Sequence, residues 1–281
     1  MGLGGHLTWT AVAREMVNAG IAEKVLPCEI IAGQYVKVVE SEIWKNNPYI
    51  TINAADFQKN KAALLQLNNP ETNYCKLDTP TMCRQRADKH CIEQICEHYG
   101  IKDPELRCEI FFTDQELETI KKIVNDLDGK YIVIEPHSKK DYTPNKEYSF
   151  DKWQKIVDEI SKHIQVVQVG NKKEKILDNV IDLVGKTTFR EAVGIIRDSC
   201  LFLSTEGGLI HASTAVDTQS LVIMTGYQSP VLWSYPQNTN IYIGTHGPCG
   251  LKKLCNQCIE DIKSHDEKEV IDKIMDFIGR Q

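Results

Sequence analysis

The segment CLFLSTEGGLIHASTAVDTQSLVIMTG, residues 200–226, decides the fold of this chain. Two short runs rich in apolar and β-branched residues, 200–205 and 220–226, have the length and composition of buried strands. The residues between them, 207–216, form a compact helix candidate that begins with two glycines. A strand, a helix and a second strand in this order predict one unit of a parallel α/β sheet.

The same alternation extends toward the amino terminus. Apolar runs at 131–135, 165–169 and 181–184 predict three more strands. A helix is expected after the first of them, because Phe150, Trp153, Ile156, Val157 and Ile160 recur at helical spacing. Thr188 and Glu191 form a capping box ahead of another helix. The region 131–226 therefore predicts a doubly wound parallel sheet.

The first half alternates less regularly. An apolar stripe over residues 9–17 predicts a helix that ends at Gly20, and 114–127 predicts a polar helix. Strands are expected at 28–33, 50–52 and 108–113, with a helix near 84–98. We place a domain boundary after the polar helix, which gives an α/β domain over 1–127 and a second over 128–281.

One element of a doubly wound first domain is missing. Its first strand would precede the glycine cluster at residues 2–5, where the sequence leaves no room for it. We expect either that residues upstream of Met1 complete the domain or that the domain is rebuilt.

Composition excludes several classes of protein. The net charge of -6 disfavours a surface that binds duplex nucleic acid. No apolar run has membrane-spanning length, and no signal peptide is visible. Ten cysteines without a secretory signal indicate reduced thiols. We therefore expect a cytoplasmic protein that binds no nucleic acid.

The segment 204–215, STEGGLIHASTA, is the strongest candidate site. Gly207 and Gly208 allow close backbone approach, and the free N–H groups of the helix start attract a diphosphate. Glu206 could accept hydrogen bonds from sugar hydroxyls, and His211 lies in the first helical turn. The alternative is a tight strand-to-helix turn with a capping glutamate and a packed histidine.

Two further residues are candidates. Lys146, in a loop after the strand at 131–135, could reach a phosphate at the same end of the sheet, or it could be a solvated lysine. His6, which follows Gly4 and Gly5, could act as a general base because its pKa lies near neutrality. The alternative for His6 is a capping or packing role.

The tail carries a candidate metal site. His246, Cys249, Cys255 and Cys258 form a C-x5-C-x2-C run with a nearby histidine, which could bind one metal ion tetrahedrally. The spacing departs from paired C-x2-C motifs, so we favour free thiols here. The cysteines without ligand spacing, which we also treat as thiols, are Cys75, Cys83, Cys91, Cys96 and Cys108.

Together these segments resemble family 9 glycosyltransferases, the heptosyltransferase-like enzymes. The resemblance rests on residues 4–15, on 46–50, on the spacing from Lys146 to Trp153, and most specifically on 185–215. It implies the GT-B fold, in which two Rossmann-like doubly wound domains face a central cleft and the last helix can pack back on the first domain.

The resemblance also implies roles for single residues. Glu206, Gly207, Gly208 and His211 fall on the donor-diphosphate motif, and Lys146 falls on a lysine that helps hold the phosphates. Either Thr187 or Thr188 lies near the loop that binds the nucleotide base. Gly4 and Gly5 belong to the acceptor-side loop. His6 stands where heptosyltransferases usually carry an aspartate general base, and Glu206 stands where aspartate is more usual.

The implied activity is inverting, metal-independent transfer of a sugar from a nucleotide donor to a glycan or protein acceptor. ADP-heptose is the family's usual donor, lipopolysaccharide is the typical product, and no cofactor is required. Such an enzyme can be peripheral at the inner membrane. Two alternatives remain open: a nucleotide-sugar 2-epimerase of similar architecture and a non-catalytic nucleotide-sugar-binding homologue.

Overall fold

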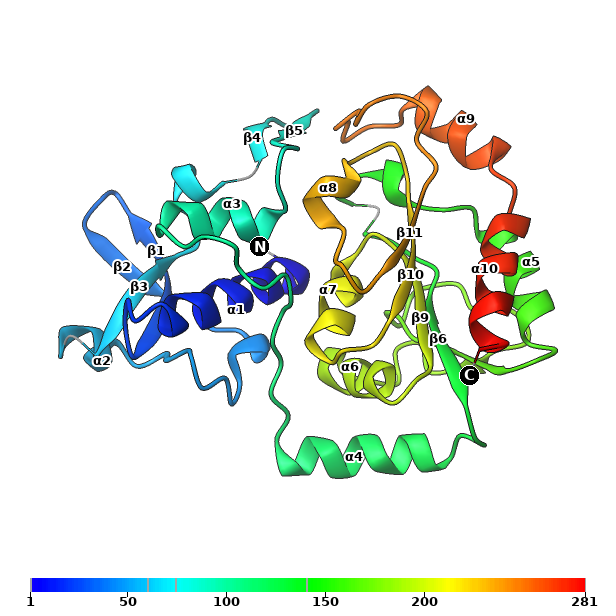
Figure 1. The fold of residues 1–281 in the computed structure, drawn as a ribbon, viewed down its shortest axis with the longest axis horizontal. Helices are drawn as coiled ribbons and strands as arrows, with labels where there is room; N and C mark the ends of the chain where they lie inside the picture. The colour runs from blue at the N-terminus through cyan, green and yellow to red at the C-terminus, as the bar shows by residue number, and fades with distance from the viewer. Residues whose placement is uncertain (1, 60, 74, 140, 281) are drawn as a thin grey trace.

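A computed structural model describes residues 2–59, 61–73, 75–139 and 141–280. Its larger sheet consists of β6 (Tyr131–Glu135), β7 (Gln165–Gln168), β8 (Ile181–Asp182), β9 (Leu201–Thr205), β10 (Ser220–Met224) and β11 (Thr239–Tyr242). These strands lie in the order β11-β10-β9-β6-β7-β8 (Figure 1). Every pair is parallel. The chain winds outward from the centre in both directions, so the predicted doubly wound sheet is confirmed.

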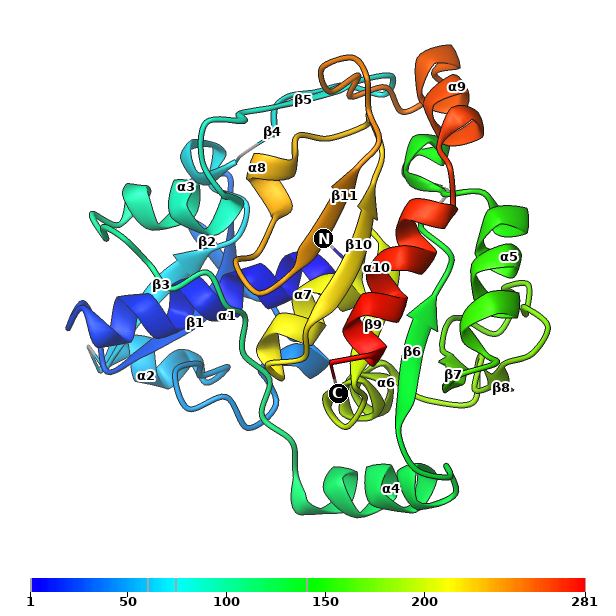
Figure 2. The same cartoon turned by 45° about the vertical axis from the view of Figure 1, so that its right-hand side comes forward.

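Helices cover both faces of this sheet. The side chains of β6 alternate between two cores, because successive residues of a strand point to opposite faces. Ile132 and Ile134 belong to a core with α5 (Phe150–Ile160) and α10 (Lys268–Ile278). Val133 belongs to a second core with α6 (Phe189–Arg197) and α7 (Gly208–Ala215). Figure 2 shows α10 beside the sheet and close to α5.

The first half holds a smaller, mixed sheet. β1 (Lys24–Ile31) pairs with β2 (Tyr35–Val38) in antiparallel fashion and with β3 (Ala62–Gln66) in parallel fashion. β4 (Cys75–Asp78) and β5 (Cys83–Gln85) form a separate antiparallel pair. The helices of this half are α1 (Leu3–Asn18), η1 (Glu42–Trp44), α2 (Ala54–Gln58), η2 (Pro70–Thr72) and α3 (Cys91–His98).

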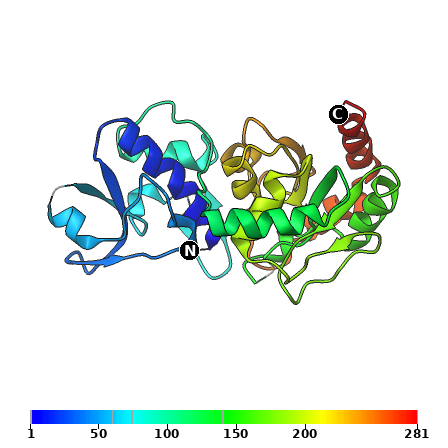
Figure 3. The same ribbon diagram turned by 90° about the horizontal axis from the view of Figure 1, so that it is seen from below.

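One of the remaining helices connects these units, two lie between strands of the larger sheet, and one follows its last strand. They are α4 (Asp114–Asn125), η3 (Pro144–Lys146), α8 (Pro230–Trp233) and α9 (Asn256–Ser264). α4 begins with a capping box between Thr113 and Glu116, and it packs against α6. Figure 3 shows α4 along the underside of the molecule. None of the helices in the described ranges is long and apolar enough to cross a bilayer.

Two predicted strands differ in the structure. Residues 108–113 have no ladder of backbone hydrogen bonds. Instead, the amide of Cys108 donates to Thr214 Oγ1 and the amide of Glu109 donates to Thr10 Oγ1. Ile50 makes only a single bridge to Val25. Threonine hydroxyls of two distant helices, α1 and α7, therefore accept hydrogen bonds from backbone amides of a segment whose composition predicted a strand.

The two halves meet through α1 and α7, which pack directly against each other. One apolar core includes Leu7 and Val12 of α1 together with Leu209 and Ala212 of α7. The glycine cluster also differs from the prediction, because Gly4, Gly5 and His6 lie in the first turn of α1 rather than in a turn before it.

The last helix also departs from the expected arrangement. α10 packs against α5, and its Val270 and Ile274 belong to the core on the outer face of the larger sheet. The expectation that this helix returns to residues 1–127 is therefore wrong. The reason is that its apolar stripe is buried against the adjacent helix of its own sheet.

Candidate functional site

The reversal of strand order lies between β6 and β9, and ligands of open α/β sheets bind beyond the carboxyl ends of strands at such a point. β9 ends at Thr205, and Gly207 is the extended N-cap of α7, with no side-chain cap. A Cβ added to Gly207 would lie 3.8 Å from Glu135 Oε2. The start of α7 therefore lies next to the end of β6, and N–H groups of a helix start that has no side-chain cap can bind an anion.

Lys146 is brought to this helix start. It ends η3, and its ammonium group forms an ion pair with the carboxylate of Glu206. Both side chains are largely buried, 15% and 11% exposed. The ammonium also lies 5.6 Å from the ring centre of Tyr142 and 5.2 Å from that of Tyr227. The structure thus joins two candidates that are far apart in the sequence.

A polar anchor that sequence reasoning missed fixes the position of η3. The Asn145 amide donates to the carbonyl groups of Leu251 and Lys253, at 2.7 and 2.8 Å. Thr225, just after β10, donates its hydroxyl to the Asn145 carbonyl at 2.6 Å. These bonds tie the loop that carries Lys146 to the same edge of the sheet.

Glu135 is a second group that the sequence analysis did not single out. It is the last residue of β6 and pairs in register with Ser204 of β9. Burial raises the pKa of Glu135 to about 8, and the charges of Glu174 and Glu147 add to the rise. Its carboxyl group is therefore largely protonated near neutrality and can donate a hydrogen bond. Its position at the carboxyl end of the strand at 131–135 was the available signal.

His211 is buried at the contact between the two halves. Its Nδ1 lies 2.7 Å from the Tyr235 hydroxyl, and its ring packs edge-on against Trp233. Burial lowers the pKa of His211 to about 3, helped by the nearby His90. These contacts match the packed-histidine alternative that the sequence left open, since a neutral buried imidazole contributes no charge to a phosphate.

The first turn of α1 brings Gly4 next to α7. A Cβ at Gly4 would lie 2.8 Å from the Cα of Gly208 and 3.1 Å from Cδ2 of His211. His6, in the same turn, points to a different neighbour: its Nδ1 lies 2.8 Å from Ser41 Oγ. Burial lowers the pKa of His6, which keeps the imidazole neutral and able to accept a proton at physiological pH.

The two threonines of the expected base-binding loop lie at the start of α6. Thr188 is its N-cap, where its hydroxyl accepts from the Glu191 amide and the Glu191 carboxylate accepts from the Thr188 amide. The predicted capping box is thus confirmed. Thr187 precedes it in a bend. Their contact with a nucleotide base stays a prediction.

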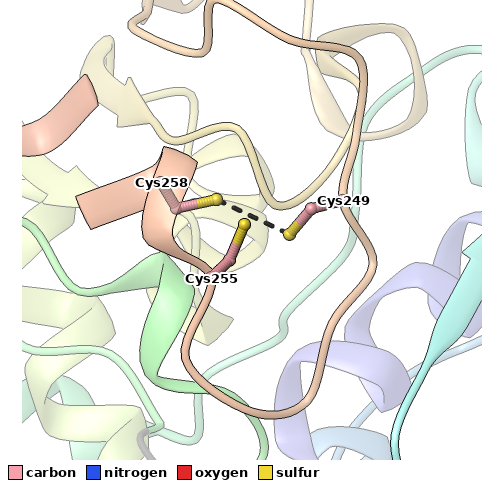
Figure 4. A group of neighbouring side chains, drawn as sticks. All are labelled: Cys249, Cys255 and Cys258. Atoms are coloured by element: carbon pink, nitrogen blue, oxygen red, sulfur yellow. Dashed lines mark hydrogen bonds between the residues drawn. The ribbon is translucent and has the colours of Figure 1, made fainter. Parts of the chain in front are cut away.

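Three cysteines of the tail converge, as Figure 4 shows. Cys249 lies in the loop after β11, Cys255 is the N-cap of α9, and Cys258 lies in its first turn. Their sulfur atoms all lie within 4.8 Å of one another, and those of Cys249 and Cys258 are 3.5 Å apart. This group could hold a metal ion.

The separations fit the chemistry of thiolate sites. Bonds of roughly 2.3 Å in a tetrahedral zinc site place sulfur atoms about 3.8 Å apart, close to the spacing here. His246 is exposed, and its Nδ1 lies 3.0 Å from Thr245 Oγ1. The predicted fourth ligand therefore lies outside the group, because the loop turns its side chain toward Thr245.

The other cysteines divide into two kinds. Cys91, Cys96 and Cys108 are buried free thiols, as predicted. Cys83 is disulfide-bonded, which contradicts the prediction of a free thiol. The side chain of Cys75 lies outside the described part of the structure.

Comparison with known proteins identifies the fold and the family. A family model described as glycosyltransferase family 9 (heptosyltransferase) matches residues 87–262, more than half of the chain. No curated protein matches the sequence. Among solved structures, the family 9 glycosyltransferase of Veillonella parvula DSM 2008 has a TM-score of 0.65 at 12% identity. That match covers 100% of this chain and 96% of the other.

Three structures of two heptosyltransferase-type proteins are also similar. The iron-containing dodecameric glycosyltransferase TibC of enterotoxigenic E. coli H10407 has a TM-score of 0.66 at 14% identity, over 100% of this chain and 74% of TibC. A second TibC structure, in complex with ADP-D-β-D-heptose, has a TM-score of 0.60 at 12% identity, with the same coverage. ADP-heptose LPS heptosyltransferase II of E. coli has a TM-score of 0.53 at 14% identity.

Coverage of heptosyltransferase II is partial: 68% of this chain matches 62% of that enzyme, less than two thirds of its length. At these identities, the likeness to the solved structures shows the α/β fold of the GT-B type, as expected.

Proposed function

The chain belongs to glycosyltransferase family 9, and we therefore propose that it transfers a sugar from a nucleoside-diphosphate donor to a hydroxyl group of a glycan. The donor we favour is ADP-heptose, because TibC, which shares this fold, has been solved with ADP-D-β-D-heptose. The observation that carries the proposal is the convergence of Lys146 and the start of α7 at the strand-order reversal.

The proposed donor site neutralises a diphosphate with groups of the chain itself. The N–H groups at the start of α7 would bind the phosphate oxygens, and Lys146 would exchange its ion pair with Glu206 for one with the diphosphate. Glu206, once released, would accept hydrogen bonds from sugar hydroxyls. The protonated carboxyl of Glu135 is placed to donate a further hydrogen bond.

The proposed reaction is one displacement with inversion. The acceptor oxygen bonds to the anomeric carbon while the bond from that carbon to the diphosphate oxygen breaks, and the acceptor proton passes to His6. The positive helix start and Lys146 would stabilise the negative charge that grows on the leaving diphosphate. Since these groups supply the positive charge, we propose that the transfer step requires no divalent metal.

The test combines nucleotide binding with product analysis. Thermal-shift measurements with ADP, UDP and GDP should give the largest stabilisation with ADP, because a bound ligand stabilises the folded state by mass action. Lys146→Met should abolish that stabilisation, whereas the control Lys162→Met, in an exposed pair with Glu159, should keep it. If no nucleotide stabilises the protein, the proposal is wrong. An epimerised nucleotide sugar in place of a transfer product would indicate the isomerase alternative.

The cysteine group supports a second part of the proposal. We propose that Cys249, Cys255 and Cys258 hold an iron or zinc ion, because thiolate ligands suit both metals. TibC is described as iron-containing. The ion would fasten the start of α9 to the loop after β11, which is a structural role outside the proposed donor site.

A further inference from the structure

Residues 249–255, which we call the cysteine loop, join two of the three thiols that converge in the tail (Figure 4). Cys249 begins this loop and Cys255 ends it. A metal ion bound to both thiols would fix the two ends, and closing a loop removes conformational freedom from the residues between its ends. The positions of residues 250–254 therefore depend on the state of the cysteine group.

One side of the cysteine loop bonds to the first half of the molecule. The Cys83 amide donates to the Gly250 carbonyl at 2.7 Å. The Lys252 amide donates to the Thr81 carbonyl at 2.9 Å. Both bonds join backbone to backbone, so the hairpin of β4 and β5 holds the middle of the loop from one side.

The other side of the loop bonds to Asn145, the residue before Lys146. The Asn145 amide group donates to the carbonyls of Leu251 and Lys253, and its Oδ1 accepts from the Cys255 amide at 2.9 Å. Asn145 is 2% exposed, so bulk water has little access to these three bonds. One buried side chain thus bonds to three residues of the cysteine loop.

A second connection runs through the chain that follows β10. The Cys249 amide donates to the Gly226 carbonyl at 2.9 Å. The Gly250 amide donates to the Tyr227 carbonyl at 3.2 Å, and the ring of Tyr227 lies 5.2 Å from the Lys146 ammonium. The lysine of the proposed donor site therefore contacts one residue that the loop bonds and follows another in the chain.

We propose that Asn145 is a positioning residue that couples the cysteine group to the donor site. When a metal ion is bound, the cysteine loop keeps the Asn145 side chain in place, and the adjacent Lys146 is held where its ammonium can meet a diphosphate. This inference rests on the proposed function. It predicts that binding of a nucleoside diphosphate depends on the metal, although the thiols lie outside the donor site.

The test is the affinity for ADP, measured by calorimetry. Protein loaded with Zn²⁺ is compared with the same protein after chelation, and circular dichroism checks that both forms are folded. Chelation should weaken ADP binding to the wild type at least about 5-fold. Asn145→Ala should show the weakened affinity in both forms, because the link between the loop and Lys146 is already broken. The matched control Asn68→Ala removes an amide that bonds to the backbone of β1 at Ile30 and should behave as wild type.

The metal dependence of ADP binding separates coupling from a merely structural role of Asn145. A structural role alone would lower the stability of Asn145→Ala but leave the metal dependence intact, which would overturn the proposal. Equal ADP affinities of loaded and chelated wild type would overturn it too. If chelation unfolds the protein, the Zn²⁺-loaded forms decide, and Asn145→Ala must bind ADP at least about 5-fold more weakly than wild type. Absence of ADP binding to loaded wild type would instead contradict the proposed function.

Thr143→Val is the milder variant to use if Asn145→Ala does not fold. The Thr143 hydroxyl donates to the same Leu251 carbonyl at 2.9 Å. Its removal should reduce the metal dependence of ADP binding without abolishing it, and an unchanged dependence in this variant would count against the coupling.

Discussion

Gly4 of α1 touches Gly208 of α7 so closely that a Cβ on Gly4 would lie 2.8 Å from the Cα of Gly208. The contact joins the first turns of two helices from different halves of the molecule, at the place where α7 offers its N–H groups. The nearest atom of α7 belongs to the backbone of Gly208. It therefore cannot move aside for a methyl group at Gly4, as the end of a flexible side chain could.

Gly4→Ala should therefore destabilise the protein by about 1–3 kcal/mol, as overpacking does. Helix propensity alone would favour alanine by about 1 kcal/mol, so a destabilising result isolates the steric effect. Gly208→Ala should be close to neutral, because its Cβ would meet Gly4 only at 3.5 Å or more. Urea unfolding of both variants measures the difference, and equal stabilities would contradict the predicted asymmetry.

The pair of Lys146 and Glu206 yields a second prediction. Lys146→Met leaves the Glu206 carboxylate buried without its partner, which should cost roughly 3–5 kcal/mol of folding stability. The double variant Lys146→Met/Glu206→Gln should recover much of the loss, because no buried charge remains. A double-mutant cycle by chemical denaturation gives the coupling, and additive losses would show that the two side chains act independently.

Arg190 of α6 connects the two halves and, through its ion pair with Glu116, makes the stability of the fold depend on pH. Its guanidinium donates to the Glu42 carbonyl at 3.0 Å and to the Glu116 carboxylate at 2.8 Å. Burial opposes the charge on Glu116, but hydrogen bonds from Arg190 and neighbouring donors lower its pKa to about 2. Because the pKa of Glu116 is lower in the folded than in the unfolded state, its ionised carboxylate stabilises the fold at pH values above the unfolded pKa of Glu. This stabilisation is lost as pH falls toward 2.

Glu116→Gln should therefore cost about 2–3 kcal/mol at pH 7, and its difference from wild type should shrink between pH 4.5 and 2. Thermal unfolding of both proteins across this range provides the measurement. A difference that stays constant with pH would show that the ionised carboxylate is not the stabilising form.

The raised pKa of Glu135 predicts that stability changes with pH in the direction opposite to the effect of Glu116. Its raised pKa means that the folded state holds a proton which the unfolded state releases between pH 4.5 and 8. Stability should consequently fall as pH rises through this window. Glu135→Gln, which keeps the shape without the titration, should remove that part of the slope. An identical pH profile of Tm in both proteins would rule out a buried, titrating carboxyl at this position.

The cysteine group predicts a bound metal. Elemental analysis of the purified protein should find about one equivalent of iron or zinc per chain, and a chelator should lower Tm. Cys255→Ser should reduce the metal content, whereas Cys200→Ser, a free thiol outside the group, should not. Metal-free protein whose Tm is indifferent to chelation would refute the site.

Local patterns predicted the strands of the larger sheet except β11, which the sequence analysis did not single out. The β-branched runs at 131–135 and 220–226 are strands, and the capping box of Thr188 with Glu191 begins a helix as expected. These signals lie within a few residues of one another, so strand composition and helix capping specify them without the rest of the chain. The run at 108–113 has the same apolar character, yet Thr10 and Thr214 bind its amides, and no local pattern contains that information.

The sequence by itself determined the alternation of strands and helices, the glycine start of α7 and the candidates Lys146, Glu206 and His6. Only the tertiary structure decided which groups meet: Lys146 with Glu206, His6 with Ser41, and Gly4 with Gly208. Only the folded environment raises the pKa of Glu135, at the end of β6, to about 8. The reason is physical, since propensity and periodicity act over neighbouring residues, whereas desolvation and side-chain pairing depend on segments that only the folded core brings together.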